Sequence, residues 1–127
     1  MKQTILIVED NDSNRLLLRD LLTYHNYEVL EAKTGSEGMR IAREILPDLI
    51  LMDIQMPLLD GLSIGRALKE DPLTSHIRII ALTSFAMAGD QEKILAAGFD
   101  GYIAKPINTR ELPLVIKKEL NGGQNGD

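Results

Sequence analysis

Side chains that could bind a cation or attack an electrophile follow directly after short apolar runs of this chain. They are Glu9 and Asp10, Asp53, Thr83 and Lys105. Three carboxylates brought together repel one another, and some would protonate unless a cation joined them. Oxygen ligands with room for water suit Mg²⁺ better than zinc or copper. With Mg²⁺ and Lys105 neutralising phosphoryl oxygens and Thr83 donating a hydrogen bond, an aspartate here could act as a nucleophile towards phosphorus.

These residues are far apart in the sequence, so they form one site only if the apolar runs lie side by side. Continuous apolar runs are typical of strands that are covered on both faces, as in a parallel sheet. They occur at 5–8, 49–52 and 79–82, and a shorter run follows at 102–104. Residues 27–32 mix charged and apolar side chains, which indicates an edge strand. In such a sheet, ligands bind outside the carboxyl ends of the strands, which is where the polar residues follow.

Helical segments separate the predicted strands. Two of them begin at capping-box spacing, with Thr34 before Glu37 and Asn108 before Glu111. Helices are expected at 14–24, from Thr34 through Ile45 to Pro47, at 61–70, at 88–97, and from Asn108 to Leu120. Strand and helix alternate five times, which predicts a doubly wound α/β fold with helices on both faces of a five-stranded parallel sheet. The expected strand order is 2-1-3-4-5, the flavodoxin-like order. Residues 1–120 would form this domain, and residues 121–127 a flexible polar tail or the start of a linker.

The composition fits one globular domain and argues against several classes of function. The chain has 127 residues and a net charge of −5, which disfavours direct binding of nucleic acid. It has no cysteine, so disulfides and thiolate metal sites are excluded. No apolar run approaches the roughly 20 residues that a membrane span needs, and no signal-peptide pattern begins the chain. We therefore expect a cytoplasmic protein without membrane insertion.

Five motifs carry the polar residues in a fixed order, and they are Val8-Glu9-Asp10-Asn11, Leu51-Met52-Asp53-Ile54-Gln55-Met56-Pro57, Asp60-Gly61, Ala81-Leu82-Thr83-Ser84 and Lys105-Pro106. Together they resemble the receiver domains of two-component response regulators, and the resemblance covers about residues 4–120. The segment 85–90 is similar to single-domain and hybrid-kinase receivers more than to those of DNA-binding regulators. The family implies a domain that accepts a phosphoryl group and changes its protein partners.

The resemblance also implies roles for single residues of the site. Asp53 matches the phosphoacceptor. Asp10 matches the acid that binds Mg²⁺ directly, and Glu9 the acid that binds it through water. The backbone carbonyl of Gln55 matches the third protein ligand of the metal.

Further positions match the switch of the family. Thr83 and Lys105 match the residues that hold the phosphoryl oxygens. On phosphorylation, Thr83 would move towards these oxygens and leave space for Tyr102 to turn inward. The Lys105–Pro106 peptide bond is expected to be cis.

Partners are expected to dock along the 14–24 helix and the loop after the 102–104 strand. Asn14, Leu17 and Pro106 would form this surface, with Leu17 at the edge of the buried stripe of the helix and Leu16 almost opposite that stripe. A histidine kinase or histidine phosphotransfer protein would supply the phosphoryl group. The downstream protein partner is unknown.

The lifetime of the phosphorylated form depends on access of water to phosphorus. In receivers, the side chains two positions after the phosphoacceptor and two after the threonine flank this approach, and here they are Gln55 and Phe85. Gln55 could orient a water molecule, whereas the apolar ring of Phe85 could exclude one. We expect exclusion to dominate and the phosphorylated form to be long-lived.

Other functions fit parts of the pattern. A haloacid-dehalogenase-type phosphatase also uses a nucleophilic aspartate with Mg²⁺, but it carries a second acid where this chain has Gln55. A flavin carrier of the same fold would need a hydroxyl- and glycine-rich loop where Glu9 and Asp10 lie. The chain could also be the receiver portion of a larger hybrid kinase. Asp53 taken alone could be a surface aspartate, so the functional interpretation rests on the five motifs together.

Overall fold

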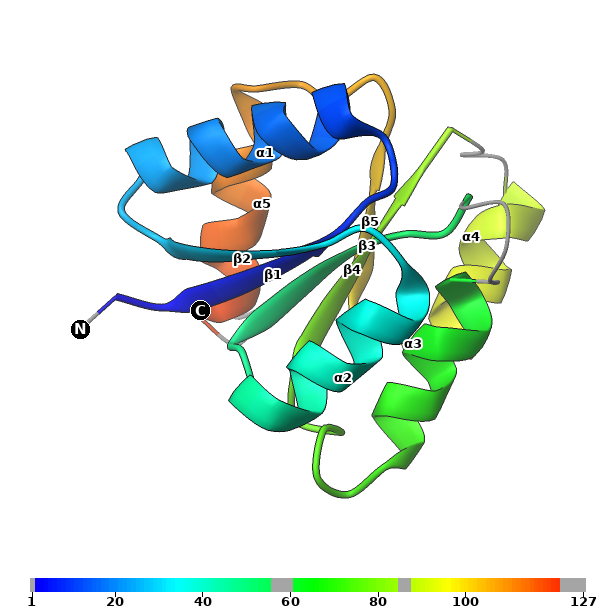
Figure 1. Ribbon diagram of the computed structural model, residues 1–127. Helices are drawn as coiled ribbons and strands as arrows, with labels where there is room; N and C mark the ends of the chain where they lie inside the picture. The colour runs from blue at the N-terminus through cyan, green and yellow to red at the C-terminus, as the bar shows by residue number, and fades with distance from the viewer. Residues whose placement is uncertain (1, 56–60, 85–87, 122–127) are drawn as a thin grey trace.

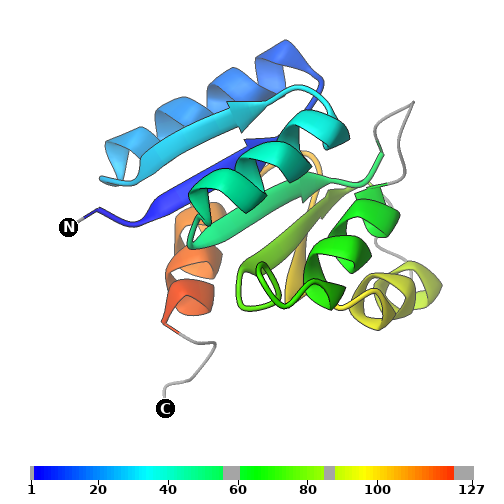
Figure 2. The ribbon, with the colours of Figure 1, turned by 60° about the horizontal axis from the view of Figure 1, so that its bottom comes forward.

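One parallel sheet forms the centre of the protein. The computed structural model describes residues 2–55, 61–84 and 88–121. Its strands lie in the order β2-β1-β3-β4-β5, which confirms the predicted topology. Their arrowheads point towards the same edge of the sheet (Figure 2). The strands are β1 (Thr4–Val8), β2 (Glu28–Ala32), β3 (Leu49–Asp53), β4 (Arg78–Thr83) and β5 (Gly101–Ala104).

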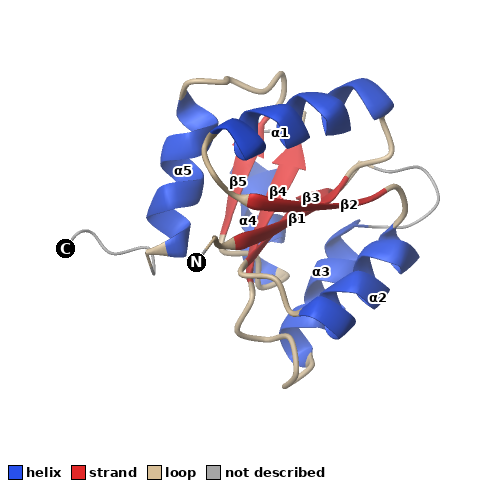
Figure 3. Cartoon of the chain, turned by 60° about the vertical axis from the view of Figure 1, so that its left-hand side comes forward, coloured by secondary structure: helices blue, strands red, loops and turns tan. Residues whose placement is uncertain are grey.

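Helices cover both faces of the sheet (Figure 1). They are α1 (Asp12–Tyr24), α2 (Gly35–Ile45), α3 (Gly61–Glu70), α4 (Ala88–Ala96) and α5 (Glu111–Leu120). Helices α1 and α5 lie on one face, and α2 and α3 lie on the other (Figure 3), where α4 packs into the same core. None of the helices in the described part of the chain is long and apolar enough to cross a membrane.

The two hydrophobic cores explain why the central strands are continuously apolar. Ile5 and Ile7 of β1 pack with side chains of α1 and α5. Leu6 and Val8 of the same strand pack with side chains of α2, α3 and α4. Successive side chains of a strand point to opposite faces, so a strand covered on both sides needs apolar residues at every position.

Local hydrogen bonds set where the helices begin. Helix α1 begins at Asp12, two residues before the predicted start, because the Asn11 side chain caps it by accepting the Asn14 N–H. The Thr34 hydroxyl accepts the Glu37 N–H at 3.1 Å, so this residue is the predicted N-cap of α2. The Asn108 side chain accepts the N–H groups of Arg110 and Glu111 at the start of α5.

Helix α3 begins very close to the end of β3. A Cβ atom added to Gly61 would lie 2.6 Å from the Ile54 Cα and 2.7 Å from the Asp53 carbonyl oxygen. Both distances are too short for a real Cβ atom, so a side chain at this position would push α3 away from the strand. Glycine therefore allows α3 to begin directly against the strand that carries Asp53.

Some predictions fall on parts of the chain outside the described residues. These parts are residues 56–60, with Met56, Pro57 and Asp60 of the motifs, residues 85–87, with Phe85, and residues 122–127 of the predicted tail. The proposed shielding of the phosphoryl group by Phe85 and the division into a domain and a tail thus stay predictions. Strand β2 begins at Glu28, so Tyr27, which the prediction included in the edge strand, lies outside the observed strand.

Candidate functional site

The polar residues predicted to converge do meet at the carboxyl ends of the strands. Glu9 follows β1, Asp53 ends β3 and Thr83 ends β4. All three are buried, with exposed fractions of 0%, 2% and 0%. They come together because β1 and β4 both pair with β3, which places the ends of the three strands side by side.

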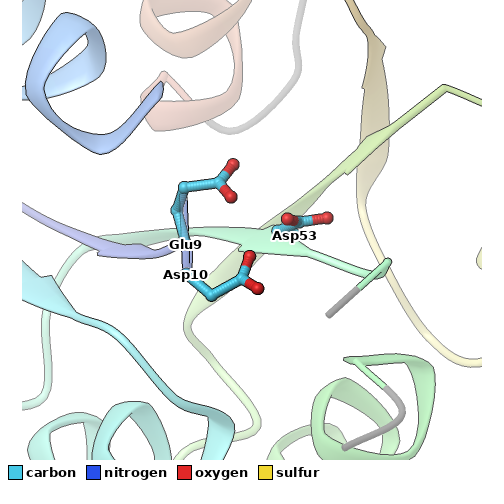
Figure 4. A group of neighbouring side chains, drawn as sticks. All are labelled: Glu9, Asp10 and Asp53. Atoms are coloured by element: carbon cyan, nitrogen blue, oxygen red, sulfur yellow. The ribbon is translucent and has the colours of Figure 1, made fainter. Parts of the chain in front are cut away.

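Three carboxylates form an oxygen cluster at this edge. One carboxylate oxygen from each of Glu9, Asp10 and Asp53 lies within 4.8 Å of the others, and the three side chains gather at the ends of β1 and β3 (Figure 4). Asp10 is exposed, whereas Glu9 and Asp53 are buried. A cation could thus reach the cluster from solvent on the side of Asp10.

Lys105 brings a positive charge to the same cluster. Its Nζ atom lies 3.1 Å from Asp53 Oδ2 and 3.6 Å from Glu9 Oε1. The Lys105 N–H donates to the Thr83 carbonyl at 2.8 Å, which extends the pairing of β4 with β5 as far as this residue. The Lys105–Pro106 peptide bond is cis. One ammonium group beside three carboxylates leaves an excess of negative charge, which favours a bound cation.

Gln55 joins the loops that follow β3 and β4. Its N–H donates to Asp53 Oδ1 at 2.8 Å, which orients the carboxylate. Its side-chain oxygen accepts the Ser84 N–H at 2.7 Å. This side-chain bridge was not predicted, since the sequence indicated a metal-binding role for the Gln55 backbone carbonyl and a role in orienting water for its side chain. The sequence did contain one signal for this bridge, a long amide side chain two residues after a strand end, which can reach the backbone of a neighbouring loop.

The Glu9 carboxylate has the most unusual environment of the cluster. Its Oε2 atom accepts the Asn11 N–H at 3.2 Å. Within the described part of the chain, its buried Oε1 atom accepts no hydrogen bond. Burial, followed by the neighbouring Asp53 carboxylate, raises the pKa of Glu9 from 4.5 to about 7. A buried oxygen left without a donor, in a set of oxygen ligands, fits a hydrated Mg²⁺ ion.

In the metal-free protein, Glu9 is expected to lower the free energy of unfolding as the pH rises. Its folded pKa of about 7 exceeds the ordinary value of 4.5, so between these values the folded form holds a proton that the unfolded form has lost. The free energy of unfolding should fall across this interval by up to roughly 3 kcal/mol from this group. Denaturant unfolding of the wild type and Glu9→Gln measures it, and the variant should lose most of this dependence. Identical pH profiles would contradict the assignment.

Tyr102 lies on β5, outside the carboxylate cluster. It is partly buried against the core on the α2–α4 side of the sheet. It also lines a surface pocket of about 400 Å³ together with Lys105 and Pro106. The switch role of Tyr102 stays a prediction, since it concerns a change between two states of the protein.

The residues predicted to dock partners lie together beside the site. Asn14, Leu17 and Pro106 line one shallow pocket of about 380 Å³ with Ser84 and Lys105. This pocket connects the surface of α1 with the lysine that contacts Asp53. Leu17 is 41% exposed, so it is available for contact.

Arg15 is a buried residue near the site that the sequence analysis missed. It is 8% exposed and donates to the Glu9 carbonyl oxygen at 3.0 Å. It stands three residues before Leu18 and seven before Leu22, the spacing of one helix face. An arginine on the buried stripe of an amphipathic helix was therefore the signal that could have found it.

Comparison with known proteins finds relatives that align with nearly the whole chain. The family model of the response regulator receiver domain matches residues 5–117. The polar-differentiation response regulator DivK of Brucella ovis is 45% identical over 120 residues, which cover 94% of this chain and 98% of that protein.

Two solved structures resemble this chain in both fold and sequence. One is the receiver domain of the sensor histidine kinase PA1611 from Pseudomonas aeruginosa, which has a magnesium ion coordinated in its active-site cleft. It is 36% identical to this chain with a TM-score of 0.87, and the match covers 95% of this chain and 99% of that one. The co-crystal structure of Ypd1 and the Ssk1 receiver domain from Saccharomyces cerevisiae contains a chain that is 31% identical with a TM-score of 0.84, and the match covers 92% of this chain and 88% of that one.

These matches favour a signalling switch over the phosphatase and the flavin carrier. The family model covers the strands that carry the carboxylate cluster, the DivK relative aligns with 94% of the chain, and a solved receiver domain shares the fold. The chain therefore belongs to the response regulator receiver domain family of two-component signalling.

Proposed function

We propose that this receiver acts as a stand-alone switch that accepts a phosphoryl group on Asp53 from a histidine kinase or a histidine phosphotransfer protein. The position of Asp53 carries the proposal. Its buried carboxylate ends the central strand, with the Lys105 ammonium group 3.1 Å from one oxygen and the Gln55 N–H 2.8 Å from the other. The carboxylate is thus held in one orientation, facing the oxygen cluster.

The neighbouring residues suit phosphoryl transfer. A bond forms between an Asp53 oxygen and phosphorus while the bond from phosphorus to the donor's imidazole nitrogen breaks, and that nitrogen keeps the electron pair. The Lys105 ammonium group exchanges its contact with the Asp53 carboxylate for one with the phosphoryl oxygens, and the buried Thr83 hydroxyl donates to one of these oxygens.

The metal ligands would be the cluster carboxylates and the Gln55 carbonyl oxygen. Mg²⁺ held there would neutralise charge on the phosphoryl oxygens as the transfer proceeds. Asp10 is the exposed member of the set and Glu9 the buried one. Glu9 would therefore act through a water molecule or by its charge, while Asp10 and Asp53 bind directly.

The phosphorylated form would select its partners through β4 and β5. Thr83 and Tyr102 lie on these neighbouring strands, and Ala81 pairs with Tyr102 in the sheet. Movement of Thr83 towards a phosphoryl group would change the space open to the Tyr102 ring. The receiver would catalyse only its own phosphorylation and dephosphorylation, and its output would be binding to a downstream protein.

Mass spectrometry of the purified protein tests the central claim. Incubation with Mg²⁺ and acetyl phosphate should add one phosphoryl group, and peptide mapping after borohydride reduction should place it on Asp53. A phosphoryl group on any other residue of the native protein would refute Asp53 as the acceptor. No modification by either a small donor or a phosphorylated histidine phosphotransfer protein would refute the function itself.

Leu17 is expected to contribute to docking of the phosphodonor protein. Leu17→Ala should lower the rate of transfer from a histidine phosphotransfer protein by about five- to tenfold, as for an apolar interface anchor. Its rate with acetyl phosphate should stay unchanged, since the small donor needs no docking surface.

Leu16→Ala is the matched control for this experiment. Leu16 has the same side chain and a similar exposure of 46%, but it points about 100° away around the helix. Equal transfer rates for Leu17→Ala and Leu16→Ala in rapid-quench kinetics would remove α1 from the proposed docking surface.

A further inference from the structure

Arg15 of α1 makes an unusual set of contacts next to the carboxylate cluster. Its Nη1 donates to the Glu9 carbonyl at 3.0 Å, its Nε donates to Glu31 Oε1 at 3.2 Å, and its Nη2 pairs with Asp12. The residue is 8% exposed. A buried guanidinium with all three nitrogens engaged is held rigidly, because its planar fork cannot move towards one partner without losing another.

The carbonyl that Arg15 holds belongs to the peptide bond between Glu9 and Asp10. The Glu9 N–H already donates to the Ala32 carbonyl of β2 at 3.0 Å, so the backbone is held in place on the N-terminal side of this peptide. Beyond it the chain leaves the sheet and enters α1 at Asp12. A peptide group is planar, so fixing its oxygen also fixes the Cα atoms on both sides. One hydrogen bond from Arg15 thereby orients two of the three cluster carboxylates.

We infer that Arg15 is a positioning residue of the metal site, which holds the Glu9–Asp10 peptide so that both carboxylates face the cation. It binds neither metal nor phosphoryl group itself. This role rests on the proposed function, in which Glu9 and Asp10 hold Mg²⁺. The remaining contacts explain why an arginine is suited to it, because Asp12 and Glu31 offset the cost of burying its charge.

Mg²⁺ titration followed by NMR of the backbone amides tests the inference without any phosphorylation. Arg15→Met keeps the apolar stem and removes every donor, and it should weaken Mg²⁺ binding about tenfold, as loss of a residue that orients metal ligands does. Arg15→Lys keeps the charge but has a shorter reach and no fork, so binding should weaken about threefold. Phosphorylation by acetyl phosphate should recover in both variants when Mg²⁺ is raised in proportion.

Two controls separate positioning from stability. Arg19 lies on the same helix and pairs with the other Glu31 oxygen at 3.7 Å, but its side chain is 45% exposed. Arg19→Met should bind Mg²⁺ like the wild type. Ile116→Val trims the buried face of α5 and lowers stability without touching the cluster, and it should also bind Mg²⁺ normally.

The outcomes distinguish this inference from the proposed function. A wild type that does not bind Mg²⁺ refutes both. Normal binding by Arg15→Met, with the wild type binding Mg²⁺ and taking up phosphoryl groups, overturns the role of Arg15 alone. If Arg15→Met does not fold, Arg15→Lys decides, and an affinity equal to that of the wild type overturns the inference. Equal weakening in Arg15→Met and Ile116→Val would show a general effect of stability and overturn it as well.

Discussion

Asp53→Asn is expected to lower phosphorylation by acetyl phosphate and by a phosphotransfer protein at least about a thousandfold, because it removes the nucleophile. An amide oxygen is far less nucleophilic than a carboxylate, although asparagine fills the same volume. The amide oxygen of the variant can still accept the Gln55 N–H, which in the wild type donates to Asp53 at 2.8 Å. The variant should therefore fold normally, and the loss should come from chemistry alone.

Phosphoprotein yield measured by intact mass checks this prediction. Asp20→Asn is the matched control, because Asp20 is an exposed aspartate on α1 whose side chain is 68% accessible. It should be phosphorylated like the wild type. Substantial modification of Asp53→Asn would show that another residue accepts the phosphoryl group in the native protein.

Asp10→Ala is expected to weaken Mg²⁺ binding by at least about tenfold, since it removes the one exposed carboxylate of the three that form the cluster. The two remaining carboxylates, Glu9 and Asp53, are buried, and both already contact Lys105. Asp10→Asn keeps a ligand oxygen but loses the charge, so it should lie between the wild type and the alanine variant. Isothermal titration calorimetry measures all three affinities.

Thermal unfolding gives an independent measure of the same site. A ligand that binds only the folded state stabilises it by about 2.7 kcal/mol at one hundred times its Kd. Adding Mg²⁺ should therefore raise the melting temperature of the wild type clearly more than that of Asp10→Ala, with Asp20→Asn behaving like the wild type. An equal increase in all three proteins would mean that the acids are not the ligands.

The architecture could be predicted because each element carries its own signal. The runs 5–8, 49–52 and 79–82 are apolar at every position, which is the pattern that a strand covered on both faces requires. Alternation with helices then leaves few parallel topologies, and the observed order is the predicted one. The errors are small and local. Asn11 extends α1 by capping it early, and Tyr27 stays outside β2.

Which residues meet at the site also followed from the sequence, because the strand ends of a parallel sheet lie at one edge. Glu9, Asp10, Asp53, Thr83 and Lys105 were predicted there from their positions after apolar runs. The structure brings the three carboxylates within 4.8 Å and Lys105 within 3.1 Å of Asp53. Residue type and topology were sufficient for this step, and no side-chain detail was needed.

How these groups are held and charged depends on packing in three dimensions. Three features of the site involve segments that pack together only in the folded chain. They are the burial of Glu9, the bridge from Gln55 to Ser84 and the bond from Arg15 to the Glu9 carbonyl. Whether such a contact forms depends on differences in distance of about a few tenths of an ångström and on which atoms lose contact with water. Neither can be read from the order of residues. Residue order was thus sufficient for the fold and the members of the site, whereas packing set their orientation and the raised pKa of Glu9, because desolvation and hydrogen-bond geometry arise only when the chain closes around them.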